Sequence, residues 1–175
     1  NFLLKNKHGS PFEQGFMSRW HIRLPIFVMR EWVRHRIGFS INEESGRYIE
    51  MRPDFYIPEN IRVQKGKPGH YTYEPAPDVD KQFAITTIKN NSEDSFNRYK
   101  NMLNEGIAKE VARIVLPLNL YTEIRWTANS RSLMNFLALR NDKSAMFEIR
   151  EYAAAIEEIF AKEMPTVYES FVSNG

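Results

Sequence analysis

The sequence predicts an α+β fold, a single domain over residues 1–175 in which a mixed β-sheet packs against several long helices. Residues 119–126 alternate polar and apolar side chains, as a half-buried strand does. Residues 144–163 carry apolar side chains at helical spacing and stop before Pro165. Because the predicted strands and helices do not alternate as strict βαβ units, α+β is favoured over α/β.

Near the start of the chain, residues 8–19 predict a turn that leads into a helix. Ser10 suits the N-cap and Pro11 suits the first helical position. Glu13 stands three residues after Ser10, which completes a capping box.

The next segment predicts a strand followed by a helix. Residues 20–29 are apolar enough for a strand or another buried segment, with Pro25 marking an edge or a break. Residues 27–36 then favour a helix, in which Arg30 and Arg34 lie on one face.

The middle of the chain predicts mostly loops. Residues 38–46 are rich in turn formers, and residues 48–52 alternate as a short strand. Residues 57–80 are interrupted by prolines and glycines, which predicts a long surface loop.

Two further helices are predicted before the C-terminal one. Asn91 or Ser92 caps the first, Gly106 weakens its middle and Pro117 ends it. Residues 129–140 form the second, which is amphipathic.

Composition excludes several classes of site. With 24 basic and 22 acidic residues the net charge is +2, which argues against a nucleic-acid binder. The absence of cysteine excludes disulfides, zinc–thiolate sites and a thiolate nucleophile, and we expect a cytoplasmic protein with no metal. No apolar run approaches the roughly 20 residues that span a bilayer. Because the chain begins with Asn1, we expect the true N-terminus to be missing.

The most informative motif is Arg34-His35-Arg36, which follows an apolar run at residues 24–29. Charges beside a core need partners, and a guanidinium pairs best with phosphate or carboxylate. The motif therefore predicts an anion site. The alternative is a solvated basic helix end.

A second motif is the loop Ser45-Gly46-Arg47. A hydroxyl, a backbone N–H and a guanidinium together suit a phosphate. The alternative is a helix N-cap at Ser45 with an exposed Arg47.

Arginines and an amide also mark the later helices. Arg131 and Asn135 share a helix face, with Arg140 further along it. The alternative is a polar face that meets water. Arg113 stands within an apolar run, which predicts that it points at an anion or a buried carboxylate.

Together these blocks resemble the flavin-dependent thymidylate synthases. Arg34-His35-Arg36, a spacer of eight residues and then Ser45 is similar to the signature of that family. The other similar blocks are residues 8–13, 113–122 and 129–140. The resemblance runs from about residue 8 to the C-terminus and is loose over residues 57–90.

The resemblance implies an enzyme that makes dTMP from dUMP. The implied methylene donor is 5,10-methylenetetrahydrofolate, and NADPH is the implied reductant of a bound FAD. It also implies a homotetramer whose active sites are shared between subunits, with no nucleic-acid or membrane partner. Such an enzyme uses no cysteine nucleophile, and this chain has none.

The resemblance also implies the site residues. Those that would bind FAD are Ser10, Arg34, His35, Arg36, Glu43, Asn129, Arg131 and Asn135. Those that would bind dUMP are Glu31, Arg34, Glu43, Glu44, Ser45, Gly46, Arg47, Arg113 and Arg140. Arg140 would be the catalytic residue, placed at the uracil edge to favour loss of the imide proton. Glu31 stands where the family more often has glutamine, so we expect it to face the base or to pair with an arginine.

Two other functions stay open at this point. The chain would be an RNA- or phospho-ligand-binding module without catalysis if the arginines only grip phosphates. It would be a family member that only assembles if it forms the tetramer but has no turnover.

Overall fold

The computed structural model describes residues 1–174, and Gly175 lies outside the described residues. The chain divides into two compact units. Unit 1 comprises Asn1–Glu43 and Glu123–Gly175, and unit 2 comprises Glu44–Thr122. Helices and strands occur in both units, which confirms the α+β class.

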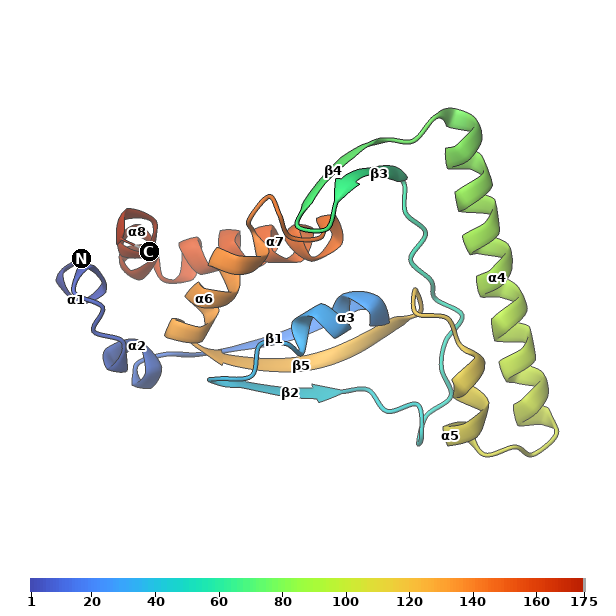
Figure 1. Cartoon of the computed structure of the whole chain (residues 1–175). Helices are drawn as coiled ribbons and strands as arrows, with labels where there is room; N and C mark the ends of the chain where they lie inside the picture. The colour runs from blue at the N-terminus through green and yellow to red at the C-terminus, as the bar shows by residue number, and fades with distance from the viewer. Residues whose placement is uncertain (175) are drawn as a thin grey trace. The chain divides into compact units, whose positions relative to one another are not determined.

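Unit 1 is built on a three-stranded sheet with the strand order β1-β5-β2. Strand β2 runs antiparallel to β5, with Phe39 opposite Ala128 and Glu43 opposite Ile124. Helices α3, α6 and α7 lie over one face of this sheet (Figure 1). The elements are α1 (Phe2–Lys5), α2 (Ser10–Gln14), β1 (Met17–Pro25), α3 (Ile26–Trp32), β2 (Phe39–Glu43), β5 (Tyr121–Asn129, whose first two residues belong to unit 2), α6 (Ser130–Arg140), α7 (Phe147–Glu163) and α8 (Pro165–Asn174).

An aromatic cluster joins the helices of unit 1 to the sheet. The Trp32 ring lies 5.1 Å from the Trp126 ring and 4.7 Å from the Phe136 ring, centroid to centroid. All three side chains are fully buried, and burying an aromatic side chain stabilises a fold by roughly 1.5–3 kcal/mol. The cluster therefore fixes the end of α3 and the body of α6 on the central strand β5.

Unit 2 consists of a long helix, two short helical turns and a two-stranded sheet. Its elements are β3 (Arg62–Lys67), β4 (His70–Pro75), α4 (Asp78–Asn104), α5 (Lys109–Ala112) and the 3₁₀ turn η1 (Arg113–Val115). The hydroxyl of the buried Tyr99 on α4 accepts a hydrogen bond from the Met51 N–H at 3.1 Å. This bond ties the segment that follows Ser45 to α4.

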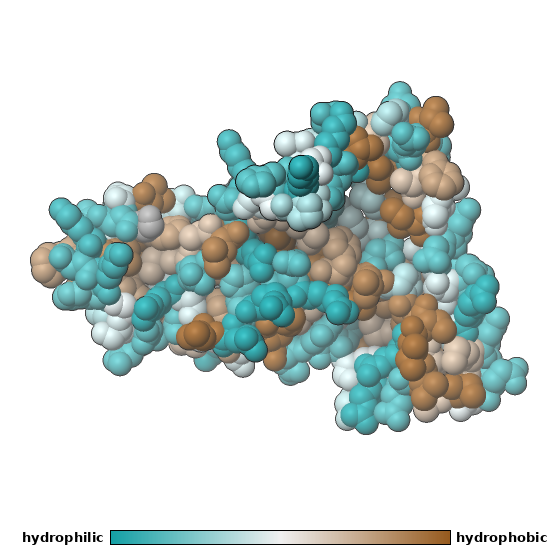
Figure 2. Space-filling view, viewed as in Figure 1, coloured by the Kyte–Doolittle hydropathy of each residue, from teal (hydrophilic) through white to brown (hydrophobic). Residues whose placement is uncertain are grey.

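Hydrophobic side chains lie at the surface of unit 2, over the beginning of α4 and around α5 (Figure 2). The most exposed of them are Val79, Phe83 and Ile114. Exposed apolar patches are typical of protein–protein contacts.

The periodic segments were predicted correctly. Residues 119–126 lie largely in β5, residues 129–140 in α6 and residues 144–163 largely in α7. Pro25 ends β1, as expected for a residue that lacks a backbone N–H. The prediction of one mixed sheet was wrong, because the strands form two separate sheets and both β2–β5 and β3–β4 are antiparallel.

Three predictions next to the arginine motif differ from the structure. Residues 38–46 are not simply a loop, because they contain β2, whose backbone pairs with β5. Residues 48–52 form no strand, because the N–H groups of Tyr48 and Ile49 both donate to the Ser45 carbonyl and close a turn. The helix predicted for residues 27–36 ends earlier, at Trp32.

The proline- and glycine-rich segment at residues 57–80 is more ordered than a surface loop. It contains the β3–β4 hairpin, whose turn uses Gly69 at a φ of 83°. Helix α4 then starts directly after Pro77, so neither Asn91 nor Ser92 is a cap. Ser92 instead donates its hydroxyl to the Ile88 carbonyl at 2.7 Å inside the helix.

Three details at the helix ends differ from the predictions. The N-cap of α2 is Gly9, not Ser10, and no side chain caps the helix, so the predicted capping box is absent. Helix α4 ends at Asn104, because Gly106 adopts a φ of 79° two residues later. A further helix, α8, begins at Pro165 and was not predicted.

None of the helices in the described part of the chain combines the length and the hydrophobicity that crossing a membrane requires.

Candidate active site

Arg140, at the last turn of α6, is held by Glu31 in the last turn of α3 and by His35, which follows that helix. Its Nε–H donates to His35 Nε2 at 2.8 Å, and its Nη1 donates to Glu31 Oε2 at 2.9 Å. Its Nη2 donates to the Glu31 backbone carbonyl at 3.1 Å. The sequence left open whether Glu31 faces the base or pairs with an arginine, and it pairs with Arg140.

His35 is buried between this ion pair and the core. Its ring contacts the rings of Phe39 and Phe136 at centroid distances of 5.9 and 5.0 Å. Burial of the ring, reinforced by the Arg140 guanidinium, lowers the pKa of His35 below its ordinary value of 6.5, and Glu31 opposes this less strongly. Because Nε2 accepts the bond from Arg140, the neutral ring carries its proton on Nδ1.

Arg34 and Arg36 flank His35 and point away from the core. Both lie after the last residue of α3 and are exposed. Within residues 1–174, neither guanidinium has a hydrogen-bond or ion-pair partner. They therefore remain available to an anionic ligand.

Residues 33–38, which carry the Arg34-His35-Arg36 motif, form the arginine turn, and Gly38 brings this turn against the beginning of α6. It adopts a φ of 72°, and a Cβ atom at Gly38 would lie 2.1 Å from Ser132 Oγ and 2.5 Å from Asn129 Nδ2. The Ser132 hydroxyl donates to the Ile37 carbonyl at 2.7 Å, and Asn129 Oδ1 caps α6 by accepting from the Ser132 N–H at 2.9 Å. Only a glycine allows this close approach, so Gly38 sets the position of the arginine turn.

The N-terminal part of α6 presents a polar surface. Arg131 and Asn135 are exposed on one face of the helix, as their spacing predicted. Arg131 pairs with Glu13 on α2, and a Cβ atom at Gly9 would lie 2.6 Å from its guanidinium. Ser10 follows Gly9 in the sequence, is the first residue of α2 and is exposed.

The second set of predicted residues lies in unit 2. Ser45, Gly46 and Arg47 form a turn in which Ser45 Oγ accepts from the Arg47 N–H at 3.4 Å. A Cβ atom at Gly46 would lie 3.4 Å from Arg113 Cδ, so η1 packs directly on this turn. Ser45 thus caps a turn and not a helix.

The charges around this turn are partly paired. Arg47 Nε donates to Glu110 Oε2 at 3.0 Å, and both side chains are half-exposed. Arg113 is exposed and has no hydrogen-bond or ion-pair partner within residues 1–174, so it points at no buried carboxylate there. Glu44 lies 3.7 Å from Arg52, while Glu43 is exposed at the end of β2 in unit 1.

Of the predicted residues, the structure brings Glu31, His35 and Arg140 into direct contact in unit 1. It also brings Ser45, Gly46, Arg47 and Arg113 together in unit 2. Sequence reasoning missed Glu110 and Gly38. No local signal marks Glu110 as the partner of Arg47, whereas a glycine two residues after an Arg-His-Arg motif is a signal for a special backbone conformation.

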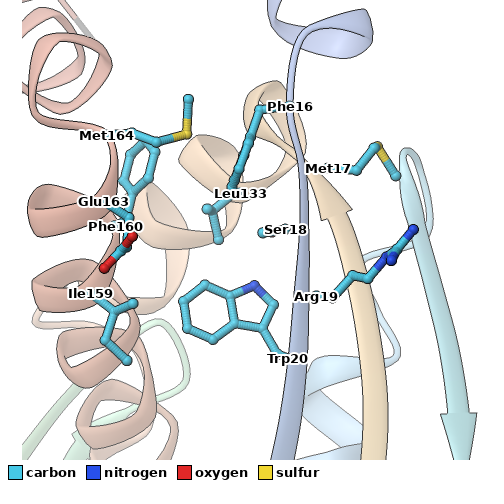
Figure 3. Close-up of a pocket in the computed structure, with 10 residues that line it drawn as sticks. All are labelled: Phe16, Met17, Ser18, Arg19, Trp20, Leu133, Ile159, Phe160, Glu163 and Met164. Carbon is cyan, nitrogen blue, oxygen red and sulfur yellow. The ribbon is translucent and has the colours of Figure 1, made fainter.

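An apolar pocket in unit 1 contains none of the predicted site residues. It has a volume of about 280 Å³ and lies between β1 and the end of α7. Figure 3 shows Trp20, Leu133 and Ile159 facing this space, while Arg19 and Met17 point away from it. The predicted chemistry therefore lies on the polar surfaces described above and not in this cavity.

Comparison with known proteins identifies a family of similar sequences. The family model described as thymidylate synthase complementing protein matches residues 1–166. A flavin-dependent thymidylate synthase of Kosmotoga olearia is 45% identical over 173 residues, which cover 98% of this chain and 74% of that protein. One from Streptomyces avermitilis is 41% identical over 184 residues, covering all of this chain and 74% of the relative.

Solved structures agree with the sequence comparison. The crystal structure of a UMP/dUMP methylase, PolB from Streptomyces cacaoi, bound with 5-Br UMP matches with a TM-score of 0.93 at 38% identity. The match covers 99% of this chain and 81% of that one, and the 5-Br dUMP complex of the same protein matches with a TM-score of 0.90. Both the sequence and the fold therefore show that this chain belongs to the flavin-dependent thymidylate synthase family and is a methyltransferase enzyme.

Proposed function

We propose that the chain catalyses the reductive methylation of dUMP to dTMP. FAD would be the bound cofactor, 5,10-methylenetetrahydrofolate the methylene donor and NADPH the reductant. The observation that carries the proposal is the match to a UMP/dUMP methylase at a TM-score of 0.93, in a chain whose predicted uracil-edge arginine is held in one orientation. Residues 1–175 would act as one domain of a cytoplasmic homotetramer with shared active sites.

The donors in unit 1 fit a flavin dinucleotide. A pyrophosphate needs cations, and Arg34 and Arg36 are exposed cations without partners within residues 1–174. Asn135 adds an exposed amide on α6. The residues proposed to hold FAD are Ser10, Arg34, His35, Arg36, Glu43, Asn129, Arg131 and Asn135. Of these, Asn129 already uses its carbonyl oxygen as the α6 cap, so its amide nitrogen is the group left for a ligand.

The turn in unit 2 fits a phosphate monoester. The turn carries the Ser45 hydroxyl and the Gly46 backbone N–H, the Arg113 side chain packs on Gly46, and Arg47 adds a second cation. We assign the dUMP phosphate to Ser45, Gly46, Arg47 and Arg113. The other residues proposed to form the dUMP site, by contact with the nucleotide or by holding a residue that contacts it, are Glu31, Arg34, Glu43, Glu44 and Arg140.

The chemistry has to proceed without a thiolate, because the chain contains no cysteine. Bound reduced flavin would supply the hydride. Arg140 would stabilise the negative charge that develops on the uracil ring when the imide proton is lost. Removing one such donor from an active site typically costs about 3–4 kcal/mol of transition-state stabilisation.

The test begins with the purified protein. We expect a yellow protein, or one that binds FAD on titration, and dUMP-dependent oxidation of the reduced flavin. Product analysis by chromatography should give dTMP when methylenetetrahydrofolate is present. UMP, which differs from dUMP only in the 2′-hydroxyl, is assayed beside it, because the matched methylase binds analogues of both, and turnover of UMP but not of dUMP would contradict dUMP as the substrate.

A protein that takes up no FAD would contradict the proposal. Steeply salt-dependent RNA binding in such a protein would instead support the binding module. Flavin binding and tetramer formation without any turnover would support a family member that only assembles.

A further inference from the structure

The Arg140 guanidinium is held by three groups of the protein itself. Three of its five N–H donors are used, by His35 Nε2, Glu31 Oε2 and the Glu31 backbone carbonyl. One N–H on Nη1 and one on Nη2 are left over. A guanidinium held at both edges can offer these two donors to a ligand in only one orientation.

The partners of Arg140 differ in what they contribute. The backbone carbonyl of Glu31 and the buried ring of His35 are fixed by the fold. The Glu31 carboxylate is the one charged partner, and its side chain is 44% exposed against 18% for Arg140. Since His35 is neutral, the three groups together carry no net charge.

We propose that Glu31 is a positioning residue, whose carboxylate acts on the reaction through Arg140 and not by contact with the nucleotide. Its hydrogen bond holds the guanidinium at the angle at which the two remaining donors meet the uracil edge. This role in catalysis rests on the proposed function, whereas the contact between Glu31 and Arg140 does not. A misplacement of about 1 Å at a reacting group can cost about 100-fold in rate, which gives such a residue a large effect.

The contact itself is tested by thermal unfolding of the holoenzyme. Glu31→Ala, Arg140→Ala and the double variant form a cycle, and Glu158→Ala on the exposed face of α7 is the matched control. We expect the double variant to melt at a temperature close to that of the less stable single variant. Losses that simply add would mean that the two side chains are not coupled, which overturns the proposal.

The catalytic role is tested by steady-state kinetics of the same variants together with Glu31→Gln. The amide oxygen that Glu31→Gln introduces can still accept the Nη1 hydrogen bond, whereas the methyl group of Glu31→Ala cannot. We expect Glu31→Ala to lower kcat by about 10- to 100-fold with a smaller change in KM for dUMP, and Glu31→Gln to recover most of kcat. In an Arg140→Ala background, Glu31→Ala should cause no further loss.

Two kinetic outcomes would overturn the proposal. Equal losses in Glu31→Gln and Glu31→Ala would mean that the charge matters and not the hydrogen bond. A rise confined to KM would mean that Glu31 contacts dUMP directly. If instead the melting cycle shows coupling but no variant, nor the parent, turns over dUMP, then the proposed function fails and the contact stands.

Discussion

At the scale of single residues, three of the arginines assigned to ligands are held by carboxylates. Arg140 pairs with Glu31, Arg131 with Glu13 and Arg47 with Glu110. These pairs differ in strength, because Arg140 is mostly buried and makes three hydrogen bonds, whereas the Arg47 pair is half-exposed. An exposed pair contributes only about 0–1 kcal/mol, so a ligand displaces its carboxylate easily.

Arg47→Ala should weaken dUMP binding more than FAD binding. The guanidinium lies in the turn assigned to the dUMP phosphate, in unit 2, whereas the residues assigned to FAD lie in unit 1. Loss of a charge-assisted hydrogen bond costs about 1.5–3 kcal/mol, or about 10- to 150-fold in Kd. Calorimetric titrations of both ligands measure this, and equal losses for both would show that the phosphate is assigned wrongly.

His35 should make the stability of the protein depend on pH. Because its pKa is lower in the folded than in the unfolded chain, the unfolded state binds more protons below about pH 6.5. The free energy of unfolding should therefore fall as the pH drops from about 7.5 to about 5.5.

Urea midpoints of the parent and of His35→Gln measure this effect. The variant keeps an acceptor for Arg140 but does not titrate, so its midpoint should change less over the same range. The two proteins differ only at residue 35, and parallel curves would therefore contradict the role of His35.

At the scale of elements, the turn at Gly38 couples the arginine motif to α6. The Ile37 carbonyl, the Ser132 hydroxyl and the Asn129 side chain meet around Gly38. The same helix carries Arg131 near its start and Arg140 at its end. One rigid helix thus positions residues assigned to both the cofactor and the substrate.

Gly38→Ala should destabilise the protein by about 2–4 kcal/mol. A positive φ costs a residue with a Cβ about 1–2 kcal/mol, and the new methyl group would also clash with Ser132. Gly106→Ala is the matched control, because Gly106 also has a positive φ but nothing lies within 4 Å of a Cβ there. Similar losses of melting temperature in both variants would mean that the contact with Ser132 is unimportant.

At the scale of the whole molecule, the two sets of site residues fall in different compact units. Arg140 and the residues assigned to FAD belong to unit 1, and the turn assigned to the phosphate belongs to unit 2. In the homotetramer that we propose, one active site would take these residues from different subunits.

Mixing two impaired variants, at a dUMP concentration well below the Kd of Arg47→Ala, tests shared sites. Arg140→Ala and Arg47→Ala each remove one residue of the proposed site, from unit 1 and unit 2 respectively. If the two residues of a site come from different subunits, an equal mixture that exchanges subunits should regain about one quarter of the parent activity. If both come from one chain, the mixture should stay as inactive as its components, which contradicts shared sites.

Elements with a clear hydrophobic period could be predicted from the sequence. Strand β5 and helices α6 and α7 bury one regular face, and that face sets the period. Strand β2 was missed because the glycines that flank it predict a loop. Its extended conformation depends on pairing with β5, which is distant in the sequence. The β3–β4 hairpin is largely exposed, so it has no hydrophobic alternation to find.

The site could be predicted only in part, for a similar reason. Motifs that are short along the chain, such as Arg34-His35-Arg36, were visible in the sequence. The contact between Glu31 and Arg140 joins residues 109 positions apart, and that of Arg47 with Glu110 joins residues 63 apart. Such pairs depend on how the elements pack, which no local pattern specifies.

The pairing of Arg47 with Glu110 should reduce the number of buffer ions that are released when a nucleotide binds. A phosphate that takes the place of the Glu110 carboxylate exchanges one anion for another at the same cation, and few ions from the buffer are released. Affinity for dUMP should then depend on salt less steeply than the number of arginines suggests. The freed carboxylate would also repel the phosphate beside it, so this glutamate would speed the release of the product as well as hold the arginine in place.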